Sequence, residues 1–364
     1  MSERRIDRFL KLMKDRGASD LHLSVGRPPI FRLNGRMDAV RYRVLDDTDF
    51  EGLLRPATPP HLWDAYVRDG DCDYAYELPG VARFRVNLYR QHRGMGAVLR
   101  IIPTKLMTME QLGLPPAVKK LTKLSGGLVL VTGPTGSGKS TTLSSIIHEM
   151  NMVRNLHFVT IEDPIEFVHD NRRSLVSQRE IGPHSKDFRN ALRAAVREDP
   201  DVILVGEMRD LETIEMALSA AETGVLVFGT LHTNSAAKTI DRVVNVFPTE
   251  RQEGVRSVLG GVLKGVLAQQ LLRRKKGGRV AALEILFGSS ALASLIREGK
   301  THQIGSMISA GKGKGMISMD ESLRRLADDD IIEAHAALEK AIDKDEMRKW
   351  LKARGMEVPA DVGE

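Results

Sequence analysis

Residues 133–140 read Gly133-Pro134-Thr135-Gly136-Ser137-Gly138-Lys139-Ser140 and fit the pattern G-x-x-x-x-G-K-[ST] at every fixed position. An apolar strand precedes this stretch and a helix is expected to begin near Lys139, which is the context that the pattern requires. The glycines let the backbone bend tightly, so that successive N–H groups and the helix N-terminus face one centre and attract phosphate. The stretch therefore predicts a binding site for a nucleoside triphosphate.

Two side chains of this loop have predicted roles of their own. Lys139 is expected to reach the β- and γ-phosphates, and the Ser140 hydroxyl to ligate Mg²⁺. The predicted nucleotide-binding residues are Gly133, Pro134, Thr135, Gly136, Ser137, Gly138, Lys139, Ser140 and Thr141.

The sequence around the loop predicts an α/β fold. Four short apolar stretches, 128–131, 158–161, 202–205 and 225–228, alternate with helical segments. Fully apolar strands spaced by helices indicate a largely parallel sheet that is covered on both faces. The predicted organisation is a small α+β domain at 1–104, a linker at 105–124, the α/β P-loop domain at 125–288 and a helical C-terminal region at 289–364.

Composition narrows the class of protein. The chain of 364 residues has 54 Lys and Arg against 48 Asp and Glu, a mildly basic balance that suits an acidic membrane surface or nucleic acid without proving either. The single cysteine, Cys72, excludes an internal disulfide framework and a multi-cysteine zinc module. No apolar stretch reaches the ~18 residues that span a bilayer, and the start does not resemble a signal peptide. These features predict a cytosolic protein.

Carboxylates follow two of the predicted strands. Glu207 comes after the strand at 202–205, with Gly206 in place of the usual aspartate. A carboxylate beside the phosphate loop can orient and deprotonate the attacking water, so Glu207 is the predicted general base. Glu162 and Glu166 end another strand and are expected to hold either the hydrated metal or a nearby arginine.

Further polar residues are candidates for sensing or stabilising the phosphates. Thr230, His232 and Asn234 follow the strand that begins at 225, where they can hydrogen-bond to the γ-phosphate. Alternation places Arg83 and Arg85 on one face of a strand. Such arginines are either solvated charges or the positive charge that a P-loop ATPase needs, often supplied by a neighbouring subunit.

The order of these motifs resembles the secretion ATPase superfamily. The resemblance rests on the phosphate loop and on the boxes at 161–167, 197–210 and 229–233. The stretches 18–23 and 83–87 are similar to its branch of pilus retraction ATPases, of the PilT and PilU type. The resemblance implies a PAS-like N-terminal domain joined to a RecA-like ATPase domain, with six copies in a ring and nucleotide between subunits.

The resemblance also implies a function and residue roles. ATP hydrolysis would act on the inner-membrane platform protein of the type IV pilus and return pilin to the membrane. The protein would be cytoplasmic and bound peripherally to the inner face of the inner membrane, and a paralogous pilus ATPase would be a further partner. By this resemblance, Glu207 is the catalytic carboxylate of an atypical Walker B strand. The family's aspartate box contains Glu162, Asp163 and Glu166, and its histidine box contains His232. The N-terminal arginines that look toward a neighbour's nucleotide are Arg83, Arg85 and Arg100.

Three departures from the family pattern leave room for an accessory, PilU-like role. Val225 stands where a second histidine is usual, which predicts the loss of one contact linked to the γ-phosphate. The C-terminal motif at 291–298 lacks an internal arginine and asparagine, which Ala293 and Ser294 replace. Gly260 and Gly261 stand in a predicted helix, where each costs roughly 1 kcal/mol relative to alanine.

Two other classes remain as alternatives. Pilus assembly and type II secretion motors typically carry a four-cysteine zinc module, which one cysteine cannot build. A nucleic-acid translocase would suit the basic balance, but only 5% of residues are aromatic, so base stacking has few candidates and no nucleic acid is expected.

Overall fold

The computed structural model describes residues 4–33, 35–102 and 106–356. The chain forms two compact units, one made of Met1–Lys105 with Pro164–Val168 and the other of Leu106–Asp163 with His169–Glu364. The predicted boundary between residues 104 and 105 lies outside the described residues. Of the helices within the described ranges, none is both long enough and apolar enough to cross a membrane.

The first unit is an antiparallel sheet covered by helices. Its strands have the order β3-β2-β1-β6-β5-β4. The elements are α1 (Arg5–Asp15), β1 (Asp20–Ser24), β2 (Ile30–Leu33), β3 (Arg36–Ala39), α2 (Asp47–Leu54), α3 (Pro60–Asp69), β4 (Asp71–Leu78), β5 (Ala82–Gln91) and β6 (Gly94–Ile102). Strand β5 alternates as predicted: Phe84 and Val86 are buried in the core with the three helices, while Arg83 and Arg85 point to the other face.

The second unit contains the predicted largely parallel sheet, with the strand order β13-β12-β7-β11-β10-β8-β9. Every neighbouring pair is parallel except β12 and β13. The strands are β7 (Gly127–Thr132), β8 (His157–Glu162), β9 (Leu175–Glu180), β10 (Val202–Val205), β11 (Leu226–Leu231), β12 (Leu263–Arg273) and β13 (Arg279–Phe287).

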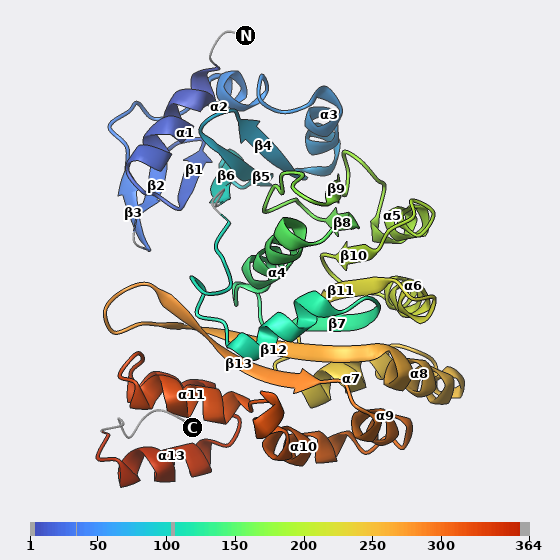
Figure 1. Cartoon of the computed structure of the whole chain (residues 1–364). Coiled ribbons are helices and arrows are strands. Elements are labelled where there is room, and N and C mark those ends of the chain that lie inside the picture. The colour runs from blue at the N-terminus through green and yellow to red at the C-terminus, as the bar shows by residue number, and fades with distance from the viewer. Residues whose placement is uncertain (1–3, 34, 103–105, 357–364) are drawn as a thin grey trace. The chain divides into compact units, whose positions relative to one another are not determined.

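Helices cover both faces of this sheet (Figure 1). The helices are η1 (Pro116–Lys123), α4 (Lys139–Val153), α5 (Phe188–Ala195), α6 (Leu211–Glu222), α7 (Ala236–Asn245), α8 (Thr249–Val262), α9 (Ser290–Arg297), η2 (Thr301–Gln303), α10 (Ile304–Ala310), η3 (Lys312–Lys314), α11 (Met319–Asp328), α12 (Ala334–Lys340) and α13 (Lys344–Ala353). As far as residue 356, the C-terminal region is helical as predicted, and it belongs to the same unit as the sheet.

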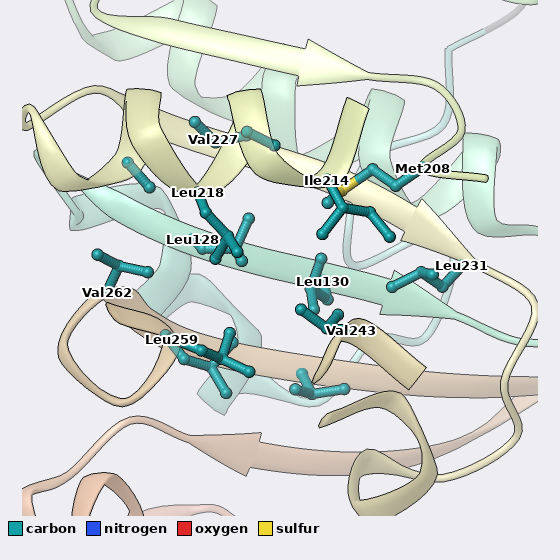
Figure 2. Close-up of a cluster of buried hydrophobic side chains, with 14 of the residues drawn as sticks. Leu128, Leu130, Met208, Ile214, Leu218, Val227, Leu231, Val243, Leu259 and Val262 are labelled. Atoms are coloured by element: carbon teal, nitrogen blue, oxygen red, sulfur yellow. The ribbon is translucent and has the colours of Figure 1, made fainter. Parts of the chain in front are cut away.

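Because side chains alternate between the two faces along each buried strand, the sheet has a hydrophobic core on each face. Leu128 and Leu130 of β7 face α5 to α10, whereas Val129 and Val131 face α4 and η1. Figure 2 shows the first of these cores, in which Ile214 and Leu218 of α6 pack over β7. Burying each side chain of this size contributes roughly 1.5–3 kcal/mol. The sheet is thereby fixed on both faces, and the loops at the carboxyl ends of its strands are held on a rigid base.

Candidate nucleotide site

The phosphate loop joins the buried strand β7 to helix α4, as predicted. Gly138 is the N-cap of α4 with φ of 88°, and Gly133 has φ of 145°. A Cβ on Gly133 would lie 2.2 Å from the backbone oxygen of Gln269, so only glycine fits this close approach. The Lys139 ammonium lies over the loop and donates to the backbone oxygens of Gly133, at 2.9 Å, and Pro134, at 3.1 Å.

Gln269 of β12 is a residue of this site that the sequence did not reveal. Its side chain is buried and bridges the loop and the first turn of α4: Nε2 donates to the Ser137 backbone oxygen at 2.6 Å, and Oε1 accepts from Thr142 Oγ1 at 2.8 Å. Because the donor and the acceptor are both used, the amide fixes the loop against the neighbouring strand. The available signal was a polar Gln269-Gln270 pair inside an otherwise apolar run.

We expect Gln269→Leu to weaken nucleotide binding by about 10-fold, because it leaves a buried carbonyl and a buried hydroxyl unpaired, at about 1–3 kcal/mol. Gln270→Leu is the matched control, since Gln270 bonds instead to the Lys340 backbone oxygen, at 3.3 Å. Fluorescent-nucleotide titration of both variants gives the comparison. Equal nucleotide affinities for the two variants would contradict the role of Gln269.

A small cavity with both polar and apolar walls lies beside Ser140, with a volume of about 30 Å³. Besides apolar residues of α4 and β10, its wall includes Thr160, Glu162, His169 and Thr230. Glu162 is oriented by two hydrogen bonds to its Oε1, from Thr160 Oγ1 at 2.6 Å and Gln178 Nε2 at 3.1 Å. The parallel strands β8 and β11, which flank β10, thus deliver polar side chains to one space next to the phosphate loop.

This donor set fits a Mg²⁺ ion that is shared with phosphates. Mg²⁺ prefers oxygen ligands and is usually held by one or two carboxylates together with substrate phosphates. The wall offers the Ser140 hydroxyl and the Glu162 carboxylate. Within the described parts of the chain, His, Cys, Asp and Glu side chains form no group of three or more that would hold a metal by themselves.

Glu207 lies just beyond the carboxyl end of β10, as the sequence predicts. Its Oε1 accepts a hydrogen bond from His232 Nε2 at 2.6 Å and pairs with Arg209 Nε. Burial alone would raise the pKa of this carboxyl, but the hydrogen bonds from Arg209 and His232 outweigh burial and lower it. Glu207 is therefore held ionised and is an acceptor, as a general base must be.

The loop after β11 is positioned by its own polar residues. Thr230 Oγ1 donates to the Gly206 backbone oxygen at 2.5 Å, which ties the ends of β10 and β11 together. Since an ionised carboxylate can only accept, His232 donates from Nε2 to Glu207. The structure therefore brings two predicted residues, Glu207 and His232, into direct contact, and it adds Arg209 to them.

Glu166 belongs to the other unit, in the segment Pro164–Val168. It lines a groove there with Lys14, Glu77 and Arg83. Among the residues that the structure describes, Glu162 but not Glu166 borders the cavity beside Ser140. The assignment of Glu166 to the metal stays a prediction.

Arg85 and Arg100 are cross-strand neighbours on β5 and β6. Arg85 makes a two-pronged pair with Asp73, with Nε–Oδ1 and Nη2–Oδ2 distances of 3.2 and 2.9 Å, on the surface of the unit. Arg100 Nε donates to the buried Asp20 at 2.7 Å, so it has a structural partner within its own unit. The exposed position of Arg85 is compatible with a role toward a neighbour.

Val225 lies at the other end of the sheet from the phosphate loop. Its backbone oxygen accepts from Gly127, the first residue of β7, whereas the loop follows the last residue, Thr132. At ~3.3 Å per residue the strand separates the two by roughly 20 Å. The expected loss of a phosphate contact at Val225 is therefore wrong for the chain's own site.

The two other departures from the family pattern, the glycine pair and the altered C-terminal motif, lie next to each other in the fold. Gly260 and Gly261 lie in helix α8, as predicted, and the altered motif forms α9. A Cβ on Gly260 would lie 3.0 Å from the Ala293 backbone oxygen, so Gly260 allows close packing of α8 on α9. This contact offsets part of the cost of a glycine inside a helix.

Comparisons with known proteins identify a family of secretion and pilus ATPases. The sequence profile of the family described as "Type II/IV secretion system protein" matches residues 65–324. The chain is 49% identical over 336 residues to the type IV pilus retraction ATPase PilT of Pseudomonas aeruginosa, covering 92% of this chain and 98% of that protein. It is 35% identical over 356 residues to the type IV pilus ATPase PilU of the same organism, covering 98% and 93%.

A solved structure is also similar over almost the whole chain. The crystal structure of the pilus retraction motor PilT with bound ADP superposes with a TM-score of 0.89 at 42% identity, covering 96% of this chain and 100% of that chain. This likeness confirms the predicted fold class, a RecA-like P-loop ATPase domain preceded by a PAS-like α+β domain.

Proposed function

The chain belongs to the Type II/IV secretion system protein family, in its branch of pilus retraction ATPases, and from this premise we propose that it is a homohexameric motor that hydrolyses ATP to retract the type IV pilus. The observation that supports the proposal is that the phosphate loop follows β7 and the ionised Glu207 follows β10, and that these parallel strands both neighbour β11, so that both features lie at the carboxyl edge of one sheet. Such an arrangement would hold phosphates at a helix N-terminus, with a base at the same edge of the sheet.

Each residue of the site has a part in the proposed reaction. The loop backbone and Lys139 bind the β- and γ-phosphates, and Gln269 keeps the loop in shape. Mg²⁺ supplied with ATP would be held by Ser140, with Glu162 beside it, and would neutralise phosphate charge. Glu207 takes the proton of the attacking water.

The resemblance also supports catalysis that is shared between subunits. In the proposed ring, Arg85 of one copy stabilises the charge that develops on the neighbour's γ-phosphate. Its pair with Asp73 is exposed and contributes little to stability, so giving up that pair costs little. Arg83 and Arg100 are proposed on the same basis, with Arg100 also holding Asp20.

Rings that mix Arg85→Ala with Lys139→Ala subunits are expected to regain activity. At equal mixing, about a quarter of the sites combine an intact Lys139 with an intact Arg85 from the neighbour, so turnover should reach about a quarter of the wild-type value. Unmixed rings of either variant should stay inactive. Arg68→Ala, which removes an exposed arginine of α3, is the control that should keep full turnover. Mixed rings that remain as inactive as their parents would refute a shared site.

We propose that the motor acts at the cytoplasmic face of the inner membrane and grips the membrane-embedded platform protein of the pilus. A paralogous pilus ATPase is a further proposed partner, since PilT and PilU occur in the same organism. The accessory role is the second candidate function, favoured by the altered residues of α9.

Steady-state ATP hydrolysis, measured where sizing shows a hexamer and with Lys139→Ala as the blank, tests the proposal. A motor should turn over well above the blank and restore twitching to cells that lack their own retraction ATPase. If the hexamer binds ATP but hydrolyses it no faster than the blank, the motor proposal is refuted and the accessory role takes its place.

A further inference from the structure

His169 borders the cavity beside Ser140 but belongs to none of the sequence motifs. It is the first residue of the second unit after the segment Pro164–Val168. Its backbone N–H donates to Gln178 Oε1 at 2.7 Å, and the same Gln178 donates from Nε2 to Glu162 at 3.1 Å. One glutamine therefore fixes both His169 and Glu162 against the cavity.

The side chain of His169 is buried yet incompletely paired. It is 8% exposed, and its Nδ1 has no hydrogen-bond partner among the described residues. Buried polar atoms in native proteins are nearly always paired with protein or ordered water, so such an atom beside a cavity points to a bound polar group. Burial, assisted by the charge of His148, lowers the pKa of His169 to about 4, so the ring is neutral near pH 7 and has one donor and one acceptor.

The cavity has the size and chemistry to hold water. Its volume of about 30 Å³ exceeds the space that one water needs, and it is too small for a nucleotide. Polar groups of Ser140, Thr160, Glu162, His169 and Thr230 line it, which is enough to bind one water from several sides. It opens beside the residue that is proposed to ligate Mg²⁺.

We propose that His169 is a positioning residue of the nucleotide site, whose imidazole holds the water that links Glu162 to the metal carried on Ser140. This inference rests on the proposed function, since it assumes that the loop binds a metal–nucleotide complex. His169 acts on the water shell of the ion and on the orientation of Glu162, and it contacts neither the phosphates nor the attacked atom. Outer-shell partners of this kind typically change metal affinity by about 10- to 100-fold.

The test is the Mg²⁺ dependence of nucleotide binding by the full-length protein. Mant-ADP is titrated with excess Mg²⁺ and again with EDTA, for wild type, His169→Phe and His169→Asn. Phenylalanine keeps the volume of the ring and removes its hydrogen bonds, so the affinity in Mg²⁺ should fall by about 10-fold while the affinity in EDTA stays unchanged. Asparagine places an amide near the position of Nδ1 and should retain most of the Mg²⁺ effect.

His148→Phe is the matched control, because His148 interacts with His169 electrostatically but is absent from the cavity wall. It should leave both affinities unchanged. A His169→Phe protein with the wild-type Mg²⁺ effect, or one that loses affinity equally in Mg²⁺ and EDTA, would overturn the assignment. Wild-type protein that binds nucleotide without hydrolysing it would overturn the motor alone, since this experiment measures binding; failure to bind nucleotide would overturn both.

Discussion

Glu207→Gln should bind ATP as tightly as the wild-type protein and hydrolyse it about 10²- to 10⁴-fold more slowly, which is the range that a general base contributes. The amide keeps the size of the side chain and still accepts a hydrogen bond from His232, which lies 2.6 Å from Oε1. It cannot take a proton from water at neutral pH. The loss should therefore fall on turnover and leave nucleotide affinity unchanged.

The lowered pKa of Glu207 predicts how the turnover of the wild-type protein depends on pH. Burial opposes ionisation, but Arg209 and His232 together hold the pKa below its ordinary value, so the carboxylate loses its charge only in acid. Wild-type turnover should consequently not fall through protonation of Glu207 between pH 6 and pH 8, since this interval lies above the ordinary glutamate value of ~4.3. A fall in turnover toward high pH would have to come from the titration of a group other than Glu207.

Glu212→Gln is the control for Glu207→Gln, since Glu212 is an exposed residue of the next helix that pairs with Arg189. Its turnover should equal that of the wild type. Single-turnover hydrolysis with fluorescent-nucleotide titration separates chemistry from binding. If Glu207→Gln kept more than about a tenth of wild-type turnover, the base would have to be another residue.

The sequence predicted the centre of the site because its signals are local. The glycine pattern fixes the phosphate loop, and a carboxylate after a short apolar strand indicates where Glu207 must lie. The register of parallel strands then brings Glu207 and His232 together, since β10 and β11 pair with Val205 opposite Gly229. Adjacent strands that end in the same direction deliver their next residues to the same edge.

What the sequence did not show depends on distant pairings. Gln269 reaches the loop from a strand that begins more than a hundred residues later in the chain. Its contact with the loop becomes visible only once β12 is known to pair with β7. Strand β9 is an edge strand with the sequence Leu-Val-Ser-Gln-Arg-Glu, so it lacks the continuous apolar run that marks a buried strand. Val225 was interpreted from motif position alone, and the direction of β11 places it at the opposite edge.

Lys139→Ala is expected to weaken ATP binding by about 10- to 100-fold, the equivalent of roughly 1.5–3 kcal/mol for a hydrogen bond to a charged group. The ammonium lies over the loop, 2.9 Å from the Gly133 oxygen and 3.1 Å from the Pro134 oxygen, within reach of phosphates bound to the same backbone. Its loss removes the only formal positive charge that the loop itself carries. Turnover should fall with binding.

The fold should survive this change, because Pro134 is exposed and its oxygen can bond to water, while the buried Gly133 stays held by its backbone hydrogen bond to Leu231. Lys238→Ala, on helix α7, is the control for the loss of one lysine and should bind ATP normally. Isothermal titration of ATP into both variants, with thermal unfolding as the check on folding, gives the result. An unchanged ATP affinity in Lys139→Ala would mean that nucleotide binds elsewhere, and the roles of Ser140, Gln269 and Glu207 would then lose their common basis. A selective loss of affinity would support phosphate binding at the N-terminus of α4, which is the premise for the proposed roles of Glu207 and His169.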